Sequence, residues 1–156
     1  MLNGAVSFDV GAVRIGLVSG SSSVYVGRWN SGSVNGQQVG GLIDVSDISA
    51  FPTNGALVSQ AGLIGHEVAE QTRKQLGNLP DVMNEYDVVA MQKRELAHQA
   101  GLDAQSAIDG AVRVGLPGVV PGLIVTRFRT SSGITGIVLQ HTINGNVLSV
   151  REKLYR

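Results

Sequence analysis

The sequence predicts an α+β fold with N-terminal antiparallel strands, two to three central helices and a C-terminal three-stranded antiparallel meander. Apolar residues alternate with polar ones at both ends of the chain, which is typical of strands. Between these ends the apolar residues follow helical spacing. The resulting order of strands, helices and strands is typical of helices packed on a largely antiparallel sheet.

We expect one domain, 1–156, because 156 residues can bury a sizeable core. The N-terminus lacks the basic start and apolar stretch of a signal peptide and runs almost at once into a strand pattern. We therefore expect the natural chain to be longer and this domain to be excised from it.

Turns rich in glycine and serine separate the expected N-terminal strands. Ser19–Ser23 is a predicted turn, and Asn30–Gly36 is a predicted loop. Asp44 and Asp47 suit turn-forming or helix-capping roles better than roles in a site. The expected strands are Ala5–Val10, Ala12–Val18, Val24–Trp29 and Gln38–Val45.

The central segment is expected to form antiparallel helices. The first runs from about Asn54 to Leu76, and Gly77 provides its C-terminal stop. The second runs from Asp81 to about Ala100 and ends at Gly101, and Asp103 caps a shorter third helix through about Val112. The short link between the first two helices favours antiparallel packing. The apolar stripe of the first helix consists of Leu57, Ala61, Ile64 and Val68.

Two turn signals divide the C-terminal region into strands. The first turn is Ser131-Ser132-Gly133. The second is Asn144-Gly145-Asn146, and its Asn-Gly pair is a strong hairpin signal. The expected strands are Leu123–Thr130, Ile134–Thr142 and Val147–Leu154.

Composition limits the function classes. The chain has 12 basic and 12 acidic residues and no long basic block, so we expect no nucleic-acid partner. It has no run of roughly 18 apolar residues, so we expect no membrane partner. The absence of cysteine excludes disulfides and cysteine nucleophiles. It is compatible with secretion or with delivery as part of a larger protein.

The segment His66-Glu67-Val68-Ala69-Glu70 is the strongest functional signal. Residues four apart share one helix face, with about 5–6 Å between their Cβ atoms, so His66 and Glu70 can bind one metal ion. Glu67 lies about 100° around the helix, which suits a general base that is not itself a ligand. His98, on the next helix, is the candidate third ligand. His141 is expected to be an exposed strand residue.

An ordinary polar helix face is the alternative interpretation of this segment. His66 lies about 200° from Ile64 and Val68, which would place it on the solvent side. Straight, aligned helices would also leave His66 and His98 about 10 Å apart in level. A metal site therefore requires a β segment over that face of the first helix, or a later start of the second helix.

The run Gly65–Glu70, with the later Ala97-His98-Gln99-Ala100, resembles a segment in C-terminal domains of bacterial Rhs/YD-repeat proteins. Such domains are commonly polymorphic toxins, and some resemble zinc metallopeptidases. The resemblance covers about Leu63 to Asp103. It implies that His66, Glu70 and His98 bind zinc and that Glu67 is the catalytic base. The commoner protease motif has histidine where this chain has Glu70.

We therefore expect a metal-dependent hydrolase, a peptidase-like bacterial toxin or effector domain that uses metal-activated water. Its expected partners are a protein or peptide substrate and an immunity or carrier protein. The alternative is a non-enzymatic structural or interaction module of a larger bacterial or phage assembly. A stable oligomer whose interface buries the first helix would favour that alternative.

Overall fold

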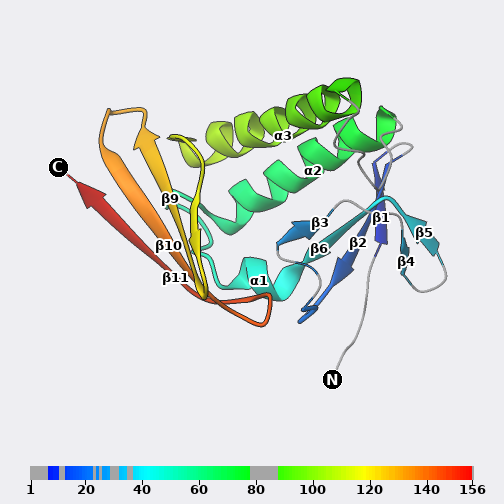
Figure 1. Ribbon diagram of the computed structural model, residues 1–156, viewed down its shortest axis with the longest axis horizontal. Helices are drawn as coiled ribbons and strands as arrows, with labels where there is room; N and C mark the ends of the chain where they lie inside the picture. Colours follow the sequence, from blue (N-terminus) through cyan, green and yellow to red (C-terminus); the bar gives the residue numbers. More distant parts are fainter. Residues whose placement is uncertain are drawn as a thin grey trace.

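Two long helices lie side by side across two separate sheets, as the computed structural model shows (Figure 1). The helices are α2 (Gln60–Leu76) and α3 (Val88–Asp109). The N-terminal sheet lies beneath one end of the helix pair and the C-terminal sheet beneath the other. This arrangement confirms the α+β class. The structure describes residues 7–10, 13–22, 24, 26–28, 32–34, 37–77 and 88–155.

The N-terminal sheet has the strand order β1-β2-β6-β3. β1 and β3 are antiparallel to their neighbours, but β2 and β6 pair in parallel, so the sheet is mixed rather than wholly antiparallel. A small hairpin of β4 and β5 precedes β6, and β4 lies inside the segment expected to be loop. The bounds are β1 Ser7–Val10, β2 Val13–Val18, β3 Gly27–Arg28, β4 Gly32–Val34, β5 Gln37–Val39 and β6 Gly41–Asp44.

A short helix, α1 (Val45–Ser49), follows β6. Asp44 caps it by accepting a hydrogen bond from the Ser46 N–H at 3.0 Å, which confirms the capping role. Asp47, within α1, links the residue before β3 to β11 (Asn146–Tyr155) of the C-terminal sheet. Its carboxylate accepts the Val26 N–H at 3.2 Å and the Val147 N–H at 2.6 Å. Burial raises the pKa of Asp47, and the two backbone hydrogen bonds oppose this rise.

α2 begins later than expected because Ser59 caps it. The Ser59 hydroxyl accepts the Gly62 N–H at 3.0 Å. Asp109 in turn holds Ser59, since its carboxylate accepts the Ser59 hydroxyl at 2.5 Å. Leu57 belongs to the buried core but precedes the helix.

α3 is one continuous helix, so the predicted stop at Gly101 and the separate third helix are wrong. Gly101 is needed inside the helix because α2 passes close to it. A Cβ atom at Gly101 would lie 2.7 Å from Cδ2 and 2.9 Å from the carbonyl oxygen of His66. Gly62 and Gly65 of α2 likewise face Asp109 and Ile108 of α3. The predicted link and start of this helix, residues 78–87, lie outside the described residues.

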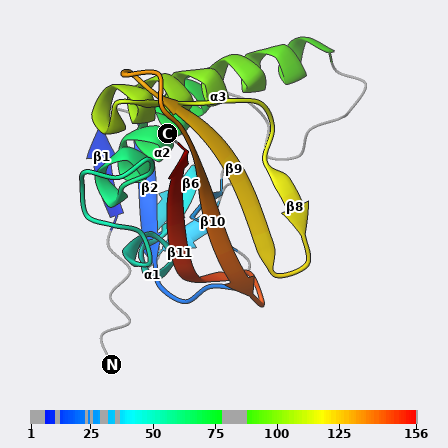
Figure 2. The same ribbon diagram turned by 90° about the vertical axis from the view of Figure 1, so that its left-hand side faces the viewer.

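The C-terminal meander is confirmed almost residue for residue. Figure 2 shows this sheet facing the viewer, with α3 above it. Asn144 and Gly145 both have positive φ, 51° and 79°, as the predicted hairpin turn requires. Two further strands, β7 and β8, pair with β9, and β7 occupies the end of the expected third helix. The bounds are β7 Ala111–Arg113, β8 Gly118–Val120, β9 Leu123–Thr130, β10 Thr135–Ile143 and β11 Asn146–Tyr155.

The hydrophobic core lies between the two sheets, beneath α2 and in contact with α1. It combines residues from both ends of the chain, including Ile15, Ile43, Phe51, Phe128 and Val138. Among the described helices, none has the length and apolar character needed to cross a membrane.

Gly101→Ala should destabilise the protein, although alanine in a helix interior is normally more favourable than glycine by about 1 kcal/mol. The added methyl group meets the His66 backbone, which cannot move aside as a side chain can. We expect a loss of about 1–3 kcal/mol in the free energy of unfolding, measured by urea denaturation. Gly65→Ala is the control, because its methyl group would meet only the end of the exposed Ile108 side chain. Equal stabilities of the two variants would contradict this packing argument.

Candidate metal centre

The buried face of α2 is polar. His66, Glu70 and Lys74 are 7%, 8% and 4% exposed, whereas Ile64 is 46% exposed. Of the predicted apolar stripe, Ile64 is exposed and Val68 is only partly buried, so the most buried face of α2 is the polar one and the placement of His66 on the solvent side is wrong. The polar face stays buried because its side chains hydrogen-bond to one another and to α3.

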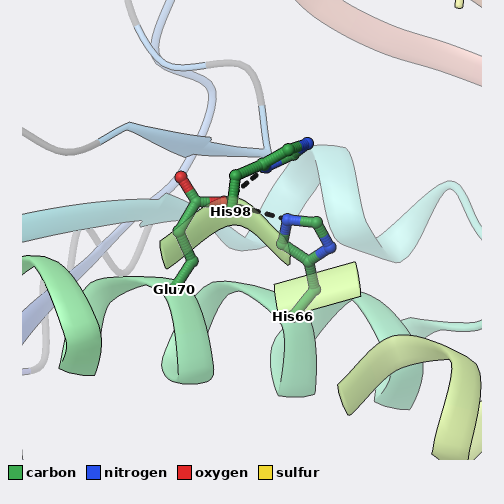
Figure 3. A group of neighbouring side chains, drawn as sticks. All are labelled: His66, Glu70 and His98. Atoms are coloured by element: carbon green, nitrogen blue, oxygen red, sulfur yellow. Dashed lines mark hydrogen bonds and ion pairs between the residues drawn. The ribbon is translucent and has the colours of Figure 1, made fainter. Parts of the chain in front are cut away.

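His66, Glu70 and His98 converge on one point (Figure 3). His66 Nε2 lies 3.0 Å from Glu70 Oε2, and His98 Nδ1 lies 2.9 Å from the same oxygen. The three potential ligand atoms lie within 4.8 Å of one another. This group could hold a metal ion. The offset of about 10 Å expected for straight helices is absent, because α3 places His98 level with Glu70.

Outer partners orient two of the three candidate ligands. Gln105 Oε1 lies 3.1 Å from His66 Nδ1, on the side of the ring away from Glu70. With a metal ion bound, an Nδ1–H that donates to this amide oxygen would leave Nε2 available as the ligand. Lys74 Nζ binds Glu70 Oε1, so the other oxygen, Oε2, remains directed at the histidines.

Glu70 is the electrostatic centre of the group. Burial alone would raise its pKa, but hydrogen bonds from His66, His98 and Lys74 outweigh burial and hold the pKa of Glu70 well below its usual range. Glu70 is therefore a carboxylate at neutral pH, the form in which it can bind a cation.

Glu67 lines the same cavity without joining the three-residue cluster. Its carboxylate packs against Gly27 of β3, where a Cβ atom would lie 1.8 Å from Glu67 Oε2. Burial raises the pKa of Glu67 to about 7, against opposing effects of His66, Lys74 and His98. A carboxyl group with this pKa can both accept and return a proton near neutral pH.

Both sheets close over the polar face of α2, as a metal site there requires. The resulting cavity has a volume of about 280 Å³. Its walls include Gly27 from the N-terminal sheet and Thr126 and Phe128 from β9. Arg113 of β7 reaches the same cavity, and its Nη2 lies 3.2 Å from His98 Nε2.

Gln105, Arg113 and Lys74 also line the cavity, although the sequence pattern did not indicate them as site residues. Gln105 lies two helical turns after His98, so it could have been found had α3 been taken as continuous. Arg113 follows from no local pattern, since it lies just after the expected third helix and no strand was expected there. The exposed position of His141 on β10 is confirmed.

No protein-family model, curated protein or solved structure matches this chain. The site must therefore be interpreted from its own geometry.

In the metal-free protein, the Glu67→Gln variant should become increasingly more stable than the wild type as pH rises from about 4.5 to about 7. The folded state binds the Glu67 proton more tightly than the unfolded state, so the wild type loses stability through this window. The neutral amide avoids this loss, and the difference should reach about 3 kcal/mol above pH 7. Urea denaturation of the chelator-treated protein at pH 5 and pH 8 measures it. Glu95→Gln, at an exposed position of α3, is the control, and an equal pH response in both variants would refute the prediction.

Proposed function

We propose that this protein is a zinc-dependent hydrolase of the peptidase type. The convergence of His66 Nε2 and His98 Nδ1 on one oxygen of Glu70 carries the proposal. Two imidazole nitrogens and one carboxylate oxygen suit zinc, and catalytic zinc sites commonly have three protein ligands and a position for water. A zinc ion in such a site acts as a Lewis acid and lowers the pKa of a water molecule to about 7.

Glu67 is the proposed general base. It is next to His66 in sequence, lines the same cavity and is absent from the three-residue cluster. It can therefore take the proton from the attacking water and pass it to the leaving amine. Gly27 permits this position because any larger residue there would displace the Glu67 carboxylate.

Partial enclosure of the cavity supports hydrolysis rather than a purely structural metal. The cavity of about 280 Å³ lies beside the three candidate ligands, with space for a substrate group. A structural zinc site normally has four protein ligands and no such space.

The proposed biological role is that of a toxin or effector domain acting on a protein or peptide. This role rests on the resemblance of Gly65–Glu70 and Ala97–Ala100 to domains of Rhs/YD-repeat proteins. An immunity or carrier protein is the partner that such a role implies.

His66→Ala and Glu70→Ala should each abolish stoichiometric zinc binding. Purified wild-type protein should hold one zinc ion per chain, measured by elemental analysis after dialysis. His141→Ala is the matched control, because this third histidine is exposed on β10. Wild-type protein without zinc affinity, or retention of full affinity in both ligand variants, would overturn the proposed site.

Glu67→Gln should retain zinc and lose peptide hydrolysis. Removal of a general base lowers kcat by about 10²–10⁴-fold, and the amide preserves the shape of the side chain. Turnover of a fluorogenic peptide library by the zinc-loaded protein measures the effect. Gly27→Ala should lower kcat as well, because its methyl group displaces the Glu67 carboxylate. A zinc-loaded Glu67→Gln variant as active as the wild type would exclude Glu67 as the base.

A further inference from the structure

Arg113 carries a positive charge into the cavity without a carboxylate partner among the described residues. Its side chain has five N–H donors and stays protonated. In the described part of the chain, the one hydrogen bond of its guanidinium is from Nη2 to His98 Nε2, at 3.2 Å. Arg113 is also half-buried, and a charged group that is partly removed from water is stabilised by an anionic partner. An anion that enters the cavity would supply this missing partner.

The acidic groups of the cavity do not neutralise Arg113. Glu70 already binds Lys74, His66 and His98. Glu67 lies against Gly27 of the N-terminal sheet, whereas Arg113 extends from β7 of the C-terminal sheet. Among the described residues, Arg113 is therefore a cation without an acidic partner, on the wall of the cavity that β7 forms.

The contact between Arg113 and His98 determines which ring nitrogen of His98 carries the proton. Arginine only donates, so His98 Nε2 accepts from Arg113, and the Nδ1–H donates to Glu70 Oε2. A metal ion bound at Nδ1 requires the proton to lie on Nε2 instead. Arg113 and Nε2 would then both be donors, so Arg113 would lose its acceptor and need another.

We propose that Arg113 is a specificity-determining residue that binds a carboxylate of the substrate. The guanidinium offers a planar pair of donors that matches a carboxylate in bidentate fashion. The imidazole of His98 separates Arg113 from Glu70, so Arg113 would bind a carboxylate beside the reacting bond rather than the bond itself. The carboxylate could belong to an acidic side chain or to the C-terminus of a peptide. The proposal rests on the proposed function for the identity of the substrate, but anion binding at Arg113 can be tested without hydrolysis.

Three capped amino acids test the proposal. N-acetyl-glutamate amide carries a side-chain carboxylate, N-acetyl-glutamine carries a C-terminal carboxylate, and N-acetyl-glutamine amide is neutral. Each is titrated into the full chain, metal-free and zinc-loaded, while the arginine side-chain N–H resonances are followed by NMR. At least one charged probe should bind about tenfold more tightly than the neutral one and shift the Arg113 resonance. The preferred charged probe identifies the source of the carboxylate.

Arg113→Gln should abolish the preference for the charged probes, and Arg113→Lys should keep part of it. Arg94→Gln, at an exposed position on α3, should leave the preference unchanged. A role of Arg113 in positioning His98 alone would alter zinc affinity without altering this preference.

Equal affinity for charged and neutral probes in the wild type would overturn the proposal, as would an unchanged preference in Arg113→Gln. The wild-type titrations decide the matter even if the variant does not fold. A protein that discriminates the probes but does not bind zinc would contradict the proposed function and leave the anion site standing. A protein that binds zinc but does not discriminate the probes would contradict the anion site and leave the proposed function standing.

Discussion

The close approach of α2 and α3 is the constraint on which the rest of the structure depends. Glycine occupies the contact on both helices, and at Gly101 the opposing atoms belong to the ring and backbone of His66. This proximity lets His98 reach the oxygen of Glu70 that His66 also contacts. A wider spacing would break the contacts of His66 with Gln105 and of Glu70 with His98, and each buried polar group that loses a partner costs about 1–3 kcal/mol. The close packing of the two helices is therefore also what gives the candidate site its geometry.

The polar face of α2 can stay buried because a few side chains satisfy one another's hydrogen bonds. Glu70 accepts from Lys74 on one oxygen and contacts both histidines with the other. Gln105 supports His66 from behind. Such a network is costly to disrupt at any one member, because the others remain buried and unpaired. It also holds the three candidate ligand side chains close together before any ion binds.

Local chemistry made part of the fold predictable. Asn144-Gly145 determines its hairpin through backbone preference alone, and the spacing of His66, Glu70 and His98 identified the candidate ligands. The errors arose where tertiary contact overrides local preference. Gly101 ends a helix in most contexts, but here α3 continues because α2 needs the space. Ile64 suggested a buried stripe, yet the two sheets and α3 enclose the opposite, polar face. Arg113 enters the site through β7, which pairs with a strand that follows it in sequence.

The hydrogen bond between Asp47 and Val147 joins residues that are 100 positions apart, so it can form only late in the synthesis of this segment. The chain is synthesised from its N-terminus, so both helices emerge before the strands that supply Thr126, Phe128 and Gln140 to the cavity. Contacts across such long separations also form slowly, because the entropy of loop closure must be overcome first. The nascent chain therefore carries its histidines and glutamates for some time without an enclosed cavity. Any activity that needs the enclosed site would begin only when β9 and β10 have joined the fold.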